Sequence, residues 1–218
     1  AILIVIMKVL CALIVALSCI NASLGDGLKC TLRPGEFPFE WRDMVDPCTK
    51  MLEAQVKTEI EASMTYLAMG AHFSQDSVNR PGFAKFFFDS ASEEREHAIK
   101  IIEYLLMRGQ LTSDVSKLLK FPLKPIAGEW SSGVKALTEA LSLETRVTRS
   151  IRKIIEKCEA PADVNFNDYH LVDWLTSDFL EEQYRGQREL AGKISTLDKM
   201  MDTHGPLGEF LYDKKLLE

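Results

Sequence analysis

The chain has 218 residues, a net charge of −6 at pH 7, 46% apolar residues and 27% charged residues. This length predicts one domain with a sizeable core, and this composition excludes a disordered protein. Positive and negative side chains are interspersed along the chain, so no basic patch for nucleic acid is expected.

The first 25 residues are predicted to be a secretory signal peptide. Lys8 precedes an apolar run over residues 9–20, and the small residues Ser23 and Gly25 follow it. We expect cleavage after Gly25, a secreted mature chain and no membrane attachment after cleavage. Residues 1–6 precede Met7 and are expected to lie upstream of the true start. A membrane anchor is the alternative, because Lys8 is the only charged residue in this stretch.

Residues 26–45 are predicted to form an irregular arm, and residues 46–218 a single all-α domain. Apolar residues recur at three- and four-residue steps, which predicts helices over about 46–73, 81–108, 132–158 and 165–202 and a short helix over 207–217. Pro47 and Pro81 suit first-turn positions. The connections are short, long and short, which is typical of a four-helix bundle with one crossover.

Three cysteines follow the signal peptide, and their odd number predicts one bond within the chain and one to another chain. In the crossover topology, the start of the first helix and the end of the third lie at the same end of the bundle. Cys48 and Cys158 occupy those two places, so we expect them to pair. Cys30, on the arm, would then bond to another chain.

Glu94 and His97 are three residues apart, so on a helix both side chains project from one face. A Glu-x-x-His pair is a recurring ligand unit in carboxylate-bridged di-iron bundles. A solvated charged face is the alternative interpretation of such a pair taken alone. The other three long helices decide between the two, since each also places polar side chains where a core face would be apolar: Glu59 and Tyr66, Glu144, and Gln183.

Buried carboxylates are costly unless a cation neutralises them, so this set predicts a site for two iron ions. Glu94 would bridge the ions, with Glu59 and His97 on one and Glu144 on the other. Tyr66 and Gln183 would orient ligands or bind weakly. Two Fe(II) ions held about 3–4 Å apart could each give one electron to O2.

From about Met44 onward the chain resembles a ferritin of the heavy-chain, iron-oxidising type, including the secreted ferritins of insects. The matching stretches are residues 59–67, 93–98, 140–144, 180–183 and 208–214. The resemblance implies a ferroxidase centre, and the residues that match its ligands are Glu59, Tyr66, Glu94, His97, Glu144 and Gln183. It also implies a hollow shell of twenty-four subunits that stores ferric mineral, with a light-type partner chain linked through Cys30.

One departure from the family pattern concerns the three-fold channel through which iron enters. Asp173 matches the first of its two acidic residues, but Thr176 stands at the second. Two other functions stay open at this stage. One is a catalytically inactive subunit of the shell. The other is a secreted helical protein resembling a cytokine, which leaves the inward polar residues unexplained.

Overall fold

The computed structural model describes residues 38–110, 118, 130–159 and 167–218. Residues 39–218 form one compact unit, and residues 1–38 are assigned to a separate one. The predicted signal peptide, most of the predicted arm with Cys30, and most of the long connection therefore lie outside the described residues. Every regular element in the described part of the chain is helical, which confirms the predicted all-α class.

The helical elements follow the predicted order. Helix α2 spans Asp46–Ser74, α3 spans Pro81–Met107, α5 spans Gly133–Glu159 and α8 spans Pro206–Lys215. Between α5 and α8, three segments follow one another without a break: α6 (Tyr169–Trp174), the π-helix η1 (Leu175–Leu180) and α7 (Glu181–His204).

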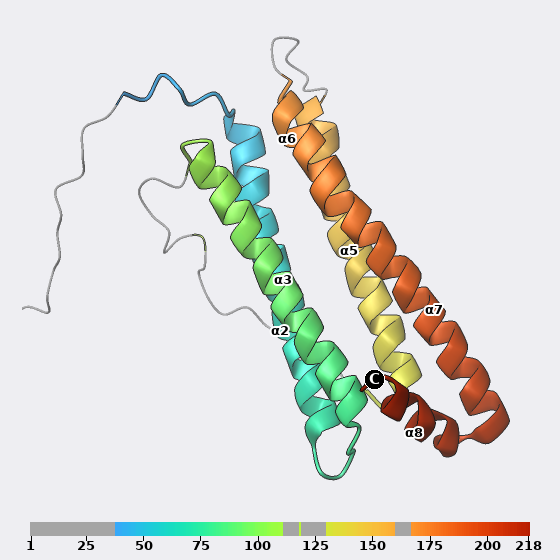
Figure 1. Ribbon diagram of the computed structural model, residues 1–218. Coiled ribbons are helices and arrows are strands. Elements are labelled where there is room, and N and C mark those ends of the chain that lie inside the picture. Colours follow the sequence, from blue (N-terminus) through green and yellow to red (C-terminus); the bar gives the residue numbers. More distant parts are fainter. Residues whose placement is uncertain (1–37, 111–117, 119–129, 160–166) are drawn as a thin grey trace, which may run out of the picture. The chain divides into compact units, whose positions relative to one another are not determined.

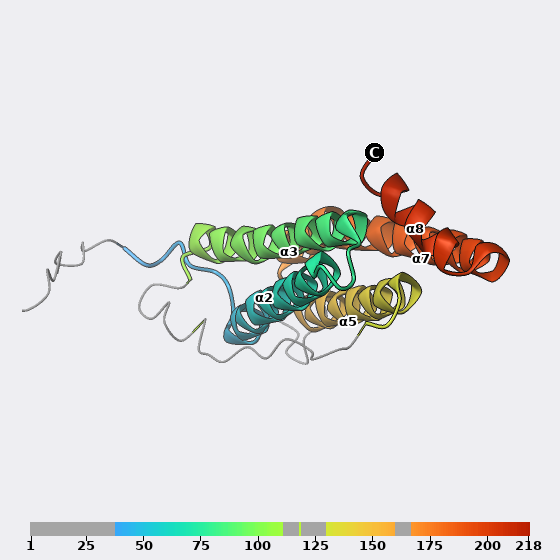
Figure 2. The same cartoon turned by 90° about the horizontal axis from the view of Figure 1, so that it is seen from below.

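The long helices pack as two antiparallel pairs. Helix α2 lies along α3, α5 lies along α7, and α2 also packs against α5 (Figures 1 and 2). Helix α3 ends at one end of the bundle and α5 begins at the other (Figure 1), which is the arrangement expected of a bundle with one long crossover. The bundle is therefore of the predicted kind, with one long crossover between its two pairs.

A disulfide bond joins the two pairs at one end of the bundle. Cys48 lies in the first turn of α2 and Cys158 in the last turn of α5, and their Cα atoms are 6.0 Å apart. Both side chains are buried, so the bond is part of the core. It fixes the start of one helix of the candidate site relative to the end of another.

The predicted continuous helix over residues 165–202 is wrong in one respect. It contains a π-helical turn, and its described helical part begins at Tyr169, where the side chain of Asp168 accepts a hydrogen bond from the Leu171 amide at 3.0 Å. A π-turn holds more residues than an α-turn, so it changes the direction of every side chain that follows. Gln183 is one of these, and η1 therefore helps to determine where Gln183 points.

Helix α8 folds back on the first turn of α3. The Asp213 side chain accepts hydrogen bonds from the backbone amides of Gly82 at 2.8 Å and Phe83 at 3.1 Å, amides that have no partner within their own helix. A Cβ atom on Gly82 would lie 1.9 Å from the Asp213 carbonyl oxygen, so this close contact requires glycine. Within the described residues, none of the helices has the length and apolar character needed to cross a membrane.

Candidate metal centre

The six predicted site residues are all buried in the middle of the bundle. They come from four helices: Glu59 and Tyr66 from α2, Glu94 and His97 from α3, Glu144 from α5, and Gln183 from α7. Apolar side chains of the core surround them on these helices. The polar residues that the sequence pattern places on core-facing positions are therefore buried in the core.

Glu59, Glu94 and His97 form a compact group whose three members are all buried. Each offers a ligand atom, and these atoms all lie within 4.8 Å of one another. The Nδ1 atom of His97 is 3.6 Å from Glu94 Oε2, which is consistent with the three-residue spacing on one face of α3. Glu59 comes from α2, whereas Glu94 and His97 come from α3, so the group forms only when these two helices pack together.

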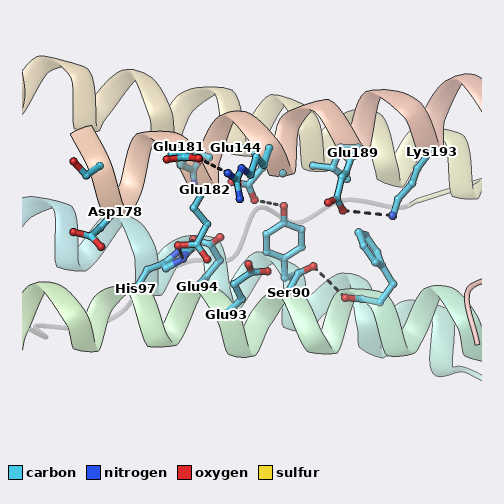
Figure 3. A pocket seen from close by; sticks show the side chains of 17 residues that line it. Ser90, Glu93, Glu94, His97, Glu144, Asp178, Glu181, Glu182, Glu189 and Lys193 are labelled. Carbon is cyan, nitrogen blue, oxygen red and sulfur yellow. Dashed lines mark hydrogen bonds and ion pairs between the residues drawn. The ribbon is translucent and has the colours of Figure 1, made fainter. Parts of the chain in front are cut away.

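Glu144 completes the carboxylate set from the opposite pair of helices. The hydroxyl group of Tyr66 donates a hydrogen bond to Glu144 Oε1, joining α2 to α5. Glu94 and Glu144 are close enough for the charge of Glu144 to raise the pKa of Glu94. In Figure 3, Glu144 lies across the pocket from Glu93 and Glu94.

Burial is the main cause of the raised pKa values of the carboxyl groups at the site. It raises the pKa of Glu59 well above its usual value, and the neighbouring Glu94 charge adds to this. Burial and the Glu144 charge raise the pKa of Glu94 in the same direction. The pKa of Glu144 is also raised by burial, although hydrogen bonds from Tyr66 and Gln183 oppose the shift. Without a cation, the site thus favours protonated carboxyl groups.

The buried atoms that lack partners fit a cation. Among the described residues, Glu59 Oε2, Glu94 Oε2 and both ring nitrogens of His97 have no hydrogen-bond partner. Buried polar atoms are rarely left unpaired, so such a cluster calls for an explanation. Carboxylate oxygens and an imidazole nitrogen are suitable ligands for iron, and iron would satisfy these atoms.

A pocket of about 610 Å³ connects this group to the surface between α3 and α7, and Figure 3 shows the side chains that line it. Two basic side chains of the lining, Arg185 and Lys193, form ion pairs with Glu181 and Glu189. Carboxylates still outnumber them, and the exposed or partly exposed ones are Glu93, Asp178, Glu181, Glu182 and Glu189. Acidic walls raise the local concentration of cations. The pocket therefore offers Fe(II) an approach to the buried group.

Sequence reasoning missed four polar residues at this site. Glu182 Oε2 lies 3.4 Å from His97 Nε2. Gln55 donates to Glu59 Oε1 at 2.8 Å, and Thr148 contacts Gln183 Oε1 at 2.8 Å and Gln187 Nε2 at 2.5 Å. Gln55 lies four residues before Glu59 and Thr148 four after Glu144, so the helical period could have indicated both.

The predicted channel residue lies elsewhere, as does the residue that departs from the channel pattern. Asp173 is exposed on α6 and takes no part in the buried group. Thr176, at the position where the family pattern has an acid, is exposed on η1 and its hydroxyl donates to the Val172 carbonyl at 2.7 Å. Cys30 lies outside the described residues.

A family model described as the ferritin-like domain matches residues 49–200. The chain belongs to the ferritin family. It is 58% identical to a ferritin heavy chain of Trichoplusia ni, covering 91% of this chain and 92% of that protein. It is 54% identical to a ferritin heavy chain of Drosophila melanogaster, covering 95% and 98%.

A solved structure agrees with these relatives. The crystal structure of a secreted ferritin of Trichoplusia ni superposes with a TM-score of 0.81 at 60% identity, covering 87% of this chain and 97% of that chain. The predicted family is thus confirmed. The chain is an iron-storage ferritin subunit, and the two curated relatives named above are ferritin heavy chains.

Proposed function

We propose that this subunit oxidises Fe(II) at the buried group formed by Glu59, Glu94, His97 and Glu144. The observation that carries the proposal is the cluster of buried, unpartnered ligand atoms on Glu59, Glu94 and His97. Iron is the substrate here. Two Fe(II) ions would each transfer one electron to O2, which would take up two protons and leave as hydrogen peroxide, and the resulting Fe(III) would leave the site for storage.

The protein's part in the reaction is to bind and to exchange protons. The carboxyl groups of Glu59, Glu94 and Glu144 favour protonation in the empty site, because burial raises the pKa of each. Fe(II) competes with these protons, so binding releases them toward the pocket. Tyr66, through its bond to Glu144, holds the carboxylate from α5 toward the centre of the bundle.

Gln183 is proposed to orient Glu144 and to ligate iron only weakly. Its carbonyl oxygen Oε1 is 2.8 Å from the Thr148 hydroxyl, which is equally close to the Glu144 backbone carbonyl, so Gln183 Oε1 and that carbonyl compete for the one Thr148 proton. Its hydrogen bond to Glu144 lowers the pKa of that carboxyl group, which requires the amide nitrogen to face Glu144. This arrangement favours the ionised Glu144 that iron binding needs.

The wider assembly is proposed from family membership. We expect a hollow shell of twenty-four subunits with ferric mineral inside, in which a light-type chain is a partner through Cys30. We also expect residues 1–25 to direct the chain into the secretory pathway, residues 26–45 to act as an arm and residues 46–218 to form the domain. Asp173 is proposed to line an iron entry channel, an assignment that its exposure on α6 allows.

The test is aerobic Fe(II) oxidation by a Glu94→Ala/His97→Ala variant, followed by absorbance of the ferric product and O2 uptake. A matched control removes the exposed Lys85–Asp89 ion pair of the same helix, whose charged atoms are 2.6 Å apart. Light scattering checks that all proteins assemble. We expect the control to oxidise iron as fast as wild type and the site variant to fall to the uncatalysed rate. Equal rates in all three at the slow uncatalysed level would make the subunit a structural member of the shell. Equally fast rates in all three would mean that the proposed site is wrong.

A further inference from the structure

One buried polar side chain next to the iron site has no role in the reaction as described so far. Gln55 lies on α2, one turn before Glu59, and only 1% of it is exposed. An amide in an apolar core is unfavourable unless it is hydrogen-bonded, and a leucine there would suit the core better. The position of Gln55 therefore requires a reason other than packing.

The hydrogen bonds of Gln55 point to that reason. Its amide nitrogen Nε2 donates to Glu59 Oε1 at 2.8 Å. Its own oxygen, Oε1, is buried and has no partner among the described residues. Within the described part of the chain, the bond to Glu59 is therefore the one side-chain hydrogen bond that orients this amide.

The consequence for Glu59 is that its two oxygens become different. Oε1 is occupied by the Gln55 amide, while Oε2 is buried without a partner and belongs to the group of potential ligand atoms. A carboxylate without this bond could rotate about its last torsion, since that torsion has a broad energy profile. The bond selects one orientation in advance of iron binding.

We propose that Gln55 is a positioning residue of the ferroxidase reaction, which holds Glu59 with one oxygen facing the iron. It acts on iron only through Glu59. The inference rests on the proposed function, because it requires Glu59 to be an iron ligand. Outer partners of metal ligands change metal affinity about 10- to 100-fold when removed, which gives the expected size of the effect.

The test uses Gln55→Met, which keeps the length and approximate volume of the side chain but cannot donate a hydrogen bond. The control is Thr65→Val, because Thr65 is also buried on α2 and, among the described residues, its hydroxyl bonds to the Glu61 carbonyl at 2.8 Å and to no site residue. Anaerobic calorimetric titration with Fe(II) measures affinity, and O2 uptake over a range of Fe(II) concentrations separates KM from kcat. Light scattering confirms the shell in each case.

We expect Gln55→Met to bind Fe(II) about 10- to 100-fold more weakly. KM should rise more than kcat falls, because pre-orientation mainly assists binding. Thr65→Val should behave as wild type. Wild-type affinity in Gln55→Met would overturn the inference, as would an equal loss in Thr65→Val, which would indicate a general effect on α2.

The Glu94→Ala/His97→Ala variant, measured in the same titration, separates this inference from the proposed function. If that variant loses Fe(II) binding while Gln55→Met retains it, the iron site is correct and the role of Gln55 is wrong. If that variant also binds and oxidises Fe(II) normally, the proposed site itself is wrong, and the role of Gln55 fails with it.

Discussion

Removing the disulfide between α2 and α5 should lower the stability of the folded chain by a large and calculable amount. Cys48 and Cys158 are 110 residues apart in sequence. In the chain-entropy model, closing a loop of that size lowers the entropy of the unfolded chain enough to stabilise the fold by about 5 kcal/mol. Both side chains are buried, so the substitution Cys48→Ala/Cys158→Ala leaves the surface of the domain unchanged.

The assay is guanidinium unfolding of the assembled protein, followed by helical circular dichroism at one protein concentration, because assembly itself contributes stability. With a slope of roughly 5 kcal/mol per molar, the loss corresponds to a midpoint about 1 M lower. Wild type with a reducing agent is the second comparison, because it loses the same loop closure without losing any atoms. The double variant is also measured with the reducing agent, since reduction would break the expected Cys30 bond between chains as well.

The two results together test the reasoning. If the double variant and the reduced wild type both unfold at a midpoint about 1 M lower, the bond stabilises by restricting the unfolded chain. If both unfold at the midpoint of the oxidised wild type with the same slope, the loop-entropy argument is refuted. Since the bond lies at one end of the bundle, the rate of Fe(II) oxidation by assembled variant should stay close to that of wild type.

Three further predictions concern the site. Tyr66→Phe removes the hydrogen bond to Glu144, so we expect assembled shells with about 10-fold slower initial O2 uptake; an unchanged rate would contradict this role. Thr148→Val removes the donor to Gln183 Oε1, and calorimetry should show Fe(II) binding weakened by about 10-fold, with wild-type affinity as the opposing outcome. The pKa of the Glu94 carboxyl group is raised above its usual value of 4.5 in the iron-free fold. The stability that this group contributes is therefore fully present below pH 4.5 and is lost as the pH rises through the raised pKa of the folded state. With a chelator present to remove iron, the melting temperature of Glu94→Gln minus that of wild type should therefore increase as the pH rises from about 5 to 8. A difference that stays constant with pH would show that the carboxyl group is not protonated in the empty site.

The sequence alone was sufficient for the fold class and for the order of the helices. Periodic apolar residues and prolines at first turns determine where α2 and α3 begin, because both effects act within one or two turns of helix. The short-long-short connections then limited the topology, and with it the pairing of Cys48 with Cys158. The Glu-x-x-His spacing on α3 likewise required only the helical period.

Only the tertiary structure decided the finer properties of the site. The π-turn before Gln183 produces no periodic pattern by itself, since it depends on how residues 169–204 pack against the rest of the bundle. The unpartnered oxygens of Glu59 and Glu94 exist because four helices exclude water there, and that exclusion is also the main cause of the raised pKa values. Gln55 shows the same limit. Its helical spacing from Glu59 is visible in the sequence, but its burial and its single bond are visible only in the folded chain.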